Sequence, residues 1–299
     1  MTKSRIGIAP MSFGALSEAA VRALALGAGE AGVAINTGEG GLSPHHLSGG
    51  GDVISQVGPA KYGVRTPSGD LDWQRLHKIG DIPQLAAIEI KVSQGAKPGK
   101  GGILPGAKVT PEIAAIRGIP VGESSISPNR FAEFSSVVGL IDFVERVKAE
   151  VPVPVGVKIV VGDPAFADDL ARTLAEEGRG LDYVSVDGAE GGTGAAPMSL
   201  TDHMGLPLRD ALITVDDAYR RWGVRDRITI IGAGRIITGA EAAFEMALGA
   251  GSCSRSVVSR RCAVTRTSAP PAWRRRARGG SAAWCPAKSS RASPITPTR

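Results

Sequence analysis

The chain has 299 residues, of which 42% are hydrophobic and 13 are aromatic. This composition excludes a disordered or collagen-like chain, and the length suits one large α/β domain or two small ones. The formal net charge of +6 would indicate an anionic partner only if it were spread over the fold. Eleven of the 35 basic residues and none of the 29 acidic residues lie in 251–299, so residues 1–250 carry a net charge of −5. We therefore expect no nucleic acid and no membrane as partner.

Targeting and redox signals are consistent with a cytoplasmic protein. No apolar run reaches the roughly eighteen residues that a membrane span needs, and the first residues lack the apolar core of a signal peptide. The three cysteines, Cys253, Cys262 and Cys285, lie together near the C-terminus and do not indicate a disulfide scaffold. The four histidines show no metal-ligand spacing, so we expect no metal site among them.

Short runs rich in Val and Ile alternate with Ala- and Leu-rich stretches of helical period. Strands are predicted at 5–11, 33–38, 87–92, 155–161, 183–188 and 228–234, with a weaker one at 119–122, and helices at 17–31, 138–150, 163–177 and 238–248. Near-continuous apolar strands that alternate with helices favour a parallel sheet buried on both faces. About seven β/α units in 250 residues fit a TIM-type (β/α)8 barrel better than a doubly wound sheet. The doubly wound sheet stays the alternative, because periodicity does not show closure.

Nearly every predicted strand ends in a polar or glycine-rich segment. These segments are 11–14, 36–41, 91–97, 187–194 and 232–235. In a β/α barrel the loops at the carboxyl ends of the strands meet on one face and form the active site. The glycine-rich stretch from His45 to about Ile82 is expected to be a long excursion on the same face.

The same segments carry a family resemblance. They read M-S-F-G-A-L-S from Met11, N-T-G-E-G-G from Asn36, I-E-I-K-V-S-Q-G-A-K-P-G from Ile88, G-G-T-G-A from Gly191, and R-D-R from Arg225 followed by G-A-G-R. In this order and spacing, from about residue 5 to 250, the sequence resembles the FMN-binding synthase domain of glutamate synthases. The resemblance implies an FMN-dependent oxidoreductase that reduces 2-iminoglutarate, formed from 2-oxoglutarate and ammonia, to L-glutamate.

Residues for a dianionic substrate follow from this resemblance. It implies that Gln94 and Lys97 hold 2-oxoglutarate, with Gly99 allowing close backbone approach, and that Lys91 lies nearer the flavin or the reacting carbon. Lys91 and Lys97 are expected on the third strand and its loop. Glu39, the acid of the glycine-rich turn after the second strand, is expected to orient the lysines or to relay a proton to the imine nitrogen.

The flavin site is implied in the same way. A cation is needed near the ring atoms N1 and O2, where negative charge collects on reduction, and Lys158 fits that role. Residues of the first, second, sixth and seventh strand ends are expected to contact the ring, the ribityl chain or the phosphate. They are Met11, Ser12, Gly14, Asn36, Asp187, Gly191, Gly192, Thr193, Gly232, Gly234 and Arg235.

Two other functions share the same motifs. One is a subunit of the N-methylglutamate synthase type, which uses this barrel with another amine donor. The other is an inactive, truncated remnant. The expected partners are 2-oxoglutarate and ammonia or glutamine-derived nitrogen, with a separate amidotransferase subunit and an electron-donor protein.

The sequence after residue 250 departs from the family. The family continues with an eighth strand, a phosphate-binding turn and a Cys-x5-Cys-x4-Cys cluster motif, whereas residues 251–299 are rich in Arg, Ser, Ala and Pro. Read one base out of frame, the codons for Val257 to Arg275 permit a Cys-x5-Cys-x4-Cys run. We therefore interpret 251–299 as a frameshifted, disordered tail beside a barrel domain at 1–250. A barrel of seven strands would leave edges on its first and seventh strands, so we expect a flavin-poor, aggregation-prone chain.

One prediction concerns the iron–sulfur cluster that the family implies. The cysteines present are spaced nine and twenty-three residues apart, unlike the compact triplet of a cluster site. We expect the purified chain to contain no iron–sulfur cluster, which iron and acid-labile sulfide assays will check. About three irons with matching sulfide per chain would contradict this.

Overall fold

Eight parallel strands form a closed barrel. The computed structural model describes residues 4–93, 101–191, 196–197 and 199–255. Around the barrel the strands follow the order β1-β10-β9-β8-β7-β4-β3-β2. Their bounds are β1 Ile6–Ile8, β2 Ala34–Asn36, β3 Val53–Val57, β4 Leu85–Lys91, β7 Val155–Val160, β8 Tyr183–Asp187, β9 Thr229–Ala233 and β10 Ser252–Arg255. The predicted TIM-type barrel is confirmed, and the doubly wound alternative is excluded.

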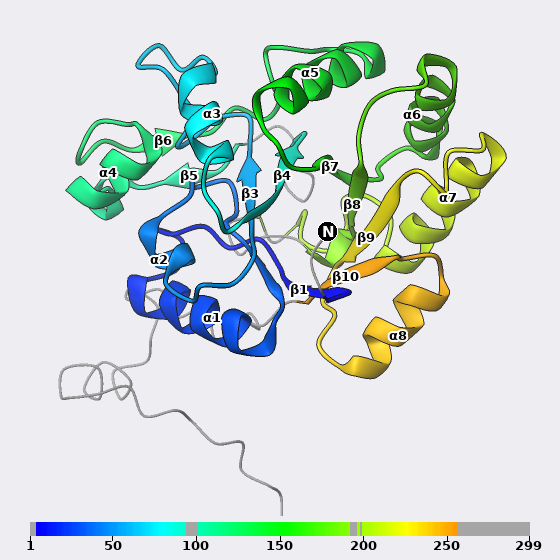
Figure 1. Ribbon diagram of the computed structural model, residues 1–299, viewed down its shortest axis with the longest axis horizontal. Coiled ribbons are helices and arrows are strands. Elements are labelled where there is room, and N and C mark those ends of the chain that lie inside the picture. The colour runs from blue at the N-terminus through cyan, green and yellow to red at the C-terminus, as the bar shows by residue number, and fades with distance from the viewer. Residues whose placement is uncertain (1–3, 94–100, 192–195, 198, 256–299) are drawn as a thin grey trace, which may run out of the picture. The chain divides into compact units, whose positions relative to one another are not determined.

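Helices surround the strands (Figure 1). The main ones are α1 Glu18–Ala31, α3 Trp73–Gly80, α5 Val137–Glu150, α6 Pro164–Glu177, α7 Leu208–Arg221 and α8 Gly239–Ala247. Shorter helices are α2 Pro44–Leu47, α4 Pro111–Arg117, and the 3-10 turns Gly106–Lys108 and Ala189–Gly191. A separate two-stranded antiparallel sheet, β5 Ile103–Leu104 with β6 Ser125–Ile126, lies between β4 and α5 in the chain.

The weak strand predicted at 119–122 was wrong, and a strand in the predicted excursion was missed. Gly118 and Gly122 both have positive φ, and the residues between them form a turn after α4. The third barrel strand is β3, which lies inside the glycine-rich stretch from His45 to Ile82 together with α2 and α3. Lys91 therefore ends the fourth barrel strand, not the third.

The glycines before β3 are required for packing. A Cβ on Gly49 would lie 1.8 Å from the carbonyl oxygen of Ala25, and a Cβ on Gly29 would lie 2.1 Å from that of Gly49. Only glycine lets the segment before β3 cross α1 at this distance. The composition that resembled a flexible loop thus belongs to a closely packed helix–strand connection.

The expectation of a seven-stranded barrel with open edges was also wrong. Strand β10 pairs on one side with β1, Ile6 opposite Cys253, and on the other with β9, Gly232 opposite Cys253. The Cys253 side chain is 1% exposed and belongs to the main apolar core. The barrel thus extends past residue 250, and both predicted edges are paired. Residues 256–299, the rest of the predicted tail, lie outside the described part of the chain.

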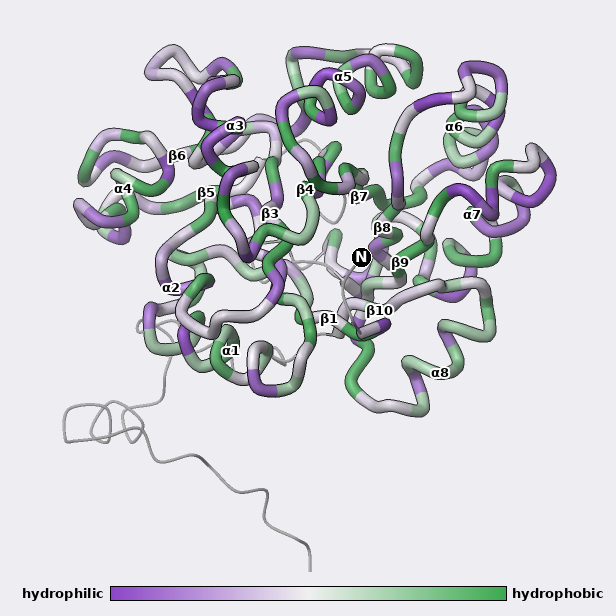
Figure 2. The backbone as a smooth tube through the Cα atoms, viewed as in Figure 1, coloured by the Kyte–Doolittle hydropathy of each residue, from purple (hydrophilic) through white to green (hydrophobic). Residues whose placement is uncertain are grey.

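The main core lies between the strands and the outer helices. Ile88, Ile90, Val184 and Val186 point from β4 and β8 into this core and are fully buried. The outer turns of α7 are largely hydrophilic, as Figure 2 shows. Among the described helices none is long and apolar enough to cross a membrane.

The R-D-R motif from Arg225 stabilises the amino-terminal ends of the strands. Arg225 bonds the carboxylate of Asp216 on α7 and donates to the carbonyl oxygens of Ile228 and Gly249, which precede β9 and β10. Arg227 donates to the Leu174 carbonyl at the end of α6. These residues lie away from the carboxyl ends of the strands, so this motif is structural.

We expect Arg225→Met to lower the free energy of unfolding by about 1–3 kcal/mol, because it removes three partly buried hydrogen bonds and leaves Asp216 with Arg220 as its arginine partner. The matched control is Arg220→Met, which removes the other arginine on Asp216. The Arg220 side chain is 64% exposed, against 21% for Arg225, so its loss should cost under about 1 kcal/mol. Urea unfolding measures both, and equal losses would show that burial does not decide the effect.

Candidate active site

Charged side chains occupy the inner face of the barrel. On β4 the residues Glu89 and Lys91 alternate with the apolar Ile88 and Ile90, so both face inward. Lys91 lies opposite Lys158 in the register between β4 and β7. Two ammonium groups therefore stand side by side at the carboxyl ends of adjacent strands, the end where β/α-barrel enzymes have their active sites.

Each lysine has a carboxylate partner from a different strand end. Lys91 Nζ lies 3.1 Å from Glu39 Oε1, and Lys158 Nζ lies 2.8 Å from Asp187 Oδ2. The four side chains are between 11% and 16% exposed. The two ion pairs thus lie at the mouth of the barrel, mostly shielded from solvent.

Burial and charge act in opposite directions on Lys158. Burial lowers its pKa, but the carboxylates of Asp187, Glu89 and Glu39 together raise the pKa above its ordinary value. Lys158 is therefore an ammonium ion at neutral pH. Burial raises the pKa of Asp187, and Lys158 opposes that shift.

The turn that carries Glu39 is held by hydrogen bonds from both sides. The Asn36 side-chain oxygen accepts from the Gly38 amide at 3.0 Å, and the Ser12 hydroxyl oxygen accepts from the Gly40 amide at 3.1 Å. Gly38 has a φ of +64°, and a Cβ there would lie 2.7 Å from the Ser12 amide nitrogen. The first and second strand loops are therefore in direct contact, which brings Ser12, Asn36 and Glu39 together.

A buried carboxylate lies beneath this turn. Glu89 Oε1 accepts from Asn36 Nδ2 at 2.9 Å and from Gln56 Nε2 at 2.6 Å, and Glu89 is 2% exposed. Sequence reasoning singled out Lys91 but not Glu89 or Gln56. The signal was present for Glu89, because it shares the strand face of Lys91 two residues away.

Arg117 is a further cation that sequence reasoning missed. Its Nη2 donates to the Phe13 carbonyl at 3.0 Å, and its guanidinium lies 4.9 Å from the Tyr62 ring centroid. Burial lowers the pKa of Arg117, while Tyr62 and Glu39 oppose the shift. As the last residue of α4, Arg117 gives no sequence signal that distinguishes it from a solvent-exposed arginine.

The first strand loop rests on a buried histidine. His46 Nε2 lies 3.4 Å from the Met11 carbonyl oxygen, and its Nδ1 lies 2.8 Å from the Ser43 hydroxyl. Burial lowers the pKa of His46 to about 4, although the Met11 carbonyl raises it. The ring is therefore neutral at pH 7, with Nε2–H donating to Met11.

Other predicted residues lie at the same end of the barrel. Gly14 follows β1 with a φ of +98°, and Gly191 ends the 3-10 turn after β8. Gly232 lies on β9, with Gly234 and Arg235 just after it, and Arg235 Nη2 bonds Asp202 at 2.6 Å. The predicted residues Gln94, Lys97, Gly99, Gly192 and Thr193 lie outside the described residues.

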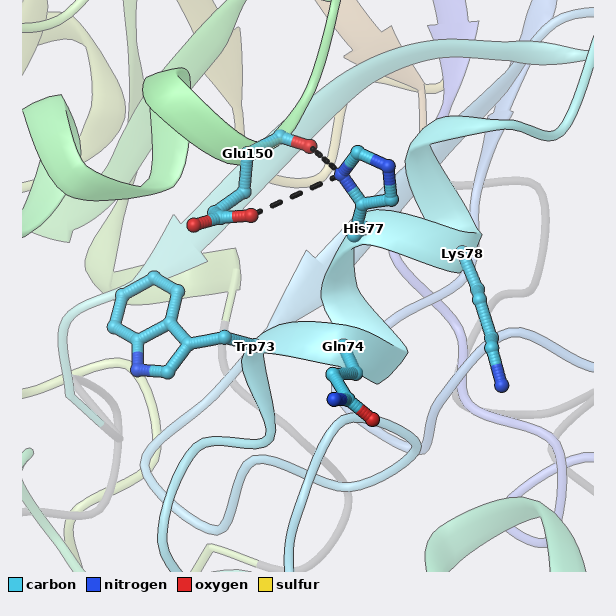
Figure 3. A pocket seen from close by; sticks show the side chains of 5 residues that line it. All are labelled: Trp73, Gln74, His77, Lys78 and Glu150. Carbon is cyan, nitrogen blue, oxygen red and sulfur yellow. Dashed lines mark hydrogen bonds and ion pairs between the residues drawn. The ribbon is translucent and has the colours of Figure 1, made fainter.

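A shallow pocket on the outer surface is remote from this chemistry. It has a volume of about 430 Å³ and is lined by Trp73, Gln74, His77, Lys78 and Glu150 (Figure 3). His77 and Glu150 lie near the ends of α3 and α5 that lead into the amino ends of β4 and β7. In the described residues, no group of three His, Cys, Asp or Glu side chains is arranged to hold a metal ion.

The closed barrel with ion-paired lysines at its mouth defines a β/α-barrel protein of the kind that hosts enzyme active sites. Comparison with known proteins gives the family. A family model described as a conserved region in glutamate synthase matches residues 1–268, past the predicted domain boundary at 250. The chain belongs to the glutamate synthase family.

Two relatives illustrate the match. The chain is 42% identical over 249 residues to the glutamate synthase large subunit-like protein YerD of Bacillus subtilis, covering 83% of this chain and 47% of the relative. It is 39% identical over 249 residues to an archaeal glutamate synthase (NADPH) of Methanocaldococcus jannaschii, covering 82% and 45%. The chain thus spans about half the length of these relatives.

A solved structure shares the fold. A mutant flavocytochrome b2 with pyruvate bound matches with a TM-score of 0.52 and 12% identity, covering 85% of this chain and 58% of that one. This likeness concerns the barrel alone.

We expect His46 to make the protein acid-sensitive. Its pKa is about 6.5 in the unfolded chain and about 4 when folded. Between these values the unfolded chain binds a proton that the folded chain does not, so stability falls as the pH falls from 6.5 to 4. Between pH 7 and pH 5 this costs about 2 kcal/mol.

His46→Asn should remove most of this loss, because its oxygen still accepts from Ser43 but does not titrate. The matched control is His77→Asn, an exposed histidine of α3, which should keep the loss. Urea unfolding at the two pH values measures it. The same loss in wild type and His46→Asn would rule out this origin.

Proposed function

We propose that this chain is the FMN-dependent synthase domain of a glutamate-forming oxidoreductase, which reduces 2-iminoglutarate formed from 2-oxoglutarate and ammonia. The observation that carries the proposal is the paired lysines, Lys91 and Lys158, on adjacent strands of a glutamate synthase family barrel. The proposed partners are a subunit or domain that supplies ammonia from glutamine and a protein that supplies electrons.

The residues present fit a bound FMN. Negative charge collects at N1 and O2 of a reduced flavin, and a protonated lysine placed beside them stabilises it. Lys158 is a buried ammonium ion at the mouth, held by Asp187. FMN would supply the electron pair and the hydrogen for the imine carbon, and Lys158 would hold the cofactor's electron-rich edge.

The mouth also fits a dianionic substrate. Lys91 is fixed by its ion pair with Glu39, and the buried guanidinium of Arg117, which Glu39 also attracts, is fixed by the Phe13 carbonyl. Cations that are already positioned need no reorganisation when a carboxylate binds. We propose that Lys91 and Arg117 face the substrate together with Gln94 and Lys97, and that Glu39 orients Lys91 and moves the proton at the imine nitrogen.

A direct test loads the purified chain with FMN, reduces it anaerobically and adds 2-oxoglutarate with ammonia. We expect flavin reoxidation together with glutamate formation, read by absorbance and mass spectrometry. Methylamine in place of ammonia distinguishes the two amine donors. Tight FMN binding without reoxidation by either pair of substrates would contradict the proposed reaction.

Lys97→Ala should weaken 2-oxoglutarate binding about ten- to hundredfold, because a charge-assisted hydrogen bond to a carboxylate contributes about 1.5–3 kcal/mol. FMN content should stay unchanged. The matched control is Lys78→Ala, an exposed lysine on α3. Calorimetric titration measures the affinity and the 450 nm region of the spectrum measures the flavin. If Lys97→Ala lost flavin but kept its 2-oxoglutarate affinity, the division of roles would be wrong.

A further inference from the structure

A buried carboxylate without an assigned role lies on the strand that carries Lys91. Glu89 is 2% exposed, and its side chain faces the interior of the barrel, on the opposite face of the strand from Ile88 and Ile90. A charge in such surroundings is costly unless hydrogen bonds satisfy it. Two amides do so at the same oxygen, Asn36 from β2 and Gln56 from β3. The carboxylate therefore links three adjacent strands beneath the mouth.

The bond to Asn36 determines which way its amide points. A side-chain amide has one donor end and one acceptor end. Because Glu89 can only accept when ionised, it takes the Nδ2 end and turns Oδ1 outward, where Oδ1 accepts from the Gly38 amide at 3.0 Å. Glu89 thus acts on the backbone of the turn at residues 37–41 through a single intervening side chain.

Strand β4 contacts this turn a second time through Lys91. Lys91 Nζ lies 3.1 Å from Glu39 Oε1, and Glu39 is the residue after Gly38. Glu89 and Lys91 are two residues apart on one face of one strand. The turn is therefore held by β4 at two points, once through Asn36 and once through the ion pair.

We infer that Glu89 is a positioning residue, whose carboxylate orients Asn36 and so keeps the turn at residues 37–41 where Glu39 meets Lys91. Its bearing on turnover rests on the proposed function, whereas its bearing on the turn does not. The charge of Glu89 also acts on Lys158. Burial lowers the pKa of Lys158, whereas Asp187 and, after it, Glu89 raise that pKa and so favour the protonated lysine.

The matched pair of variants is Glu89→Met and Gln56→Met. Both residues are 2% exposed and share one hydrogen bond, but it is the Glu89 carboxylate that accepts from Asn36. Gln56 reaches the turn through its backbone amide, which donates to Thr37 Oγ1 at 3.0 Å and is kept in Gln56→Met. In the chain as purified, hydrogen–deuterium exchange of the peptide covering residues 36–42 should become at least about tenfold faster in Glu89→Met, since the Gly38 amide loses its fixed acceptor. In Gln56→Met it should stay within about twofold of wild type. Unchanged exchange in Glu89→Met, or equal acceleration in both, would overturn the inference.

A double variant that exchanges the donor and the acceptor between positions 36 and 89 tests the same network if Glu89→Met folds poorly. In Asn36→Asp with Glu89→Gln the new amide nitrogen takes the place of Glu89 Oε1. It donates one hydrogen to the new carboxylate, which still accepts from Gly38, and the other to the side-chain oxygen of Gln56 once that amide has turned over. We expect exchange of residues 36–42 to match wild type. Exchange as fast as in Glu89→Met would show that this network does not hold the turn.

Turnover of the FMN-loaded enzyme gives an independent measure. Displacing Glu39 from Lys91 should lower kcat at least about tenfold in Glu89→Met. It should raise the KM for 2-oxoglutarate less than threefold, because the proposed cations for the substrate carboxylates, Lys91, Lys97 and Arg117, are all retained. Gln56→Met should change kcat less than threefold. If no variant and no wild-type enzyme turns over 2-oxoglutarate while the exchange difference persists, the proposed function fails and the positioning role stands. A KM effect alone, without loss of kcat, would count against the role at the reacting centre.

Discussion

Two ammonium groups enclosed by a ring of eight strands require carboxylates within hydrogen-bond reach, and much of the site follows from this requirement. Lys91 and Lys158 lie side by side on adjacent strands, so their ammonium groups would repel each other if unpaired. Glu39, from the turn after β2, and Asp187, the last residue of β8, neutralise one lysine each. Such pairs contribute little net stability, because desolvation offsets the attraction. Their effect is to fix where the positive charge lies.

The position of these charges depends on closure of the barrel. Each parallel strand pair brings only its own two loops together, and the full set of loops meets because β10 connects β9 to β1. The loops then contact one another directly, as Ser12 of the first does with Gly40 of the second. Closure also removes the unpaired edges that expose a sheet to aggregation. A strand of four residues at the end of the described chain thus supports a site built by other strands.

The site combines fixed cations with a set of buried polar side chains beneath them. Lys91 lies at the mouth, whereas Arg117 is buried against the Phe13 carbonyl, and Glu89, Gln56 and His46 are buried beneath or behind the loops. Each of these three buried side chains has at least one hydrogen bond to a residue of another element. The family model identifies the barrel as part of a glutamate synthase family protein, and the buried side chains lie directly beneath the loops at its mouth.

The sequence by itself determined the class of fold and six of the eight barrel strands. It also determined the helices α1, α5, α6 and α8, and it placed lysines at the ends of strands. The strands and helices depend on local periodicity, which each carries within its own residues. The roles expected for the lysines came from the family resemblance. Only the tertiary structure decided that Val53–Val57 and Ser252–Arg255 are strands, because a short segment with polar residues becomes a strand when partners on both sides bond its backbone. The same holds for Arg117 and Glu89. A lone arginine at a helix end shows its role only when the fold brings Phe13 within hydrogen-bond distance. The strand face of Glu89 follows from the sequence, but its partner Asn36 is decided by strand pairing.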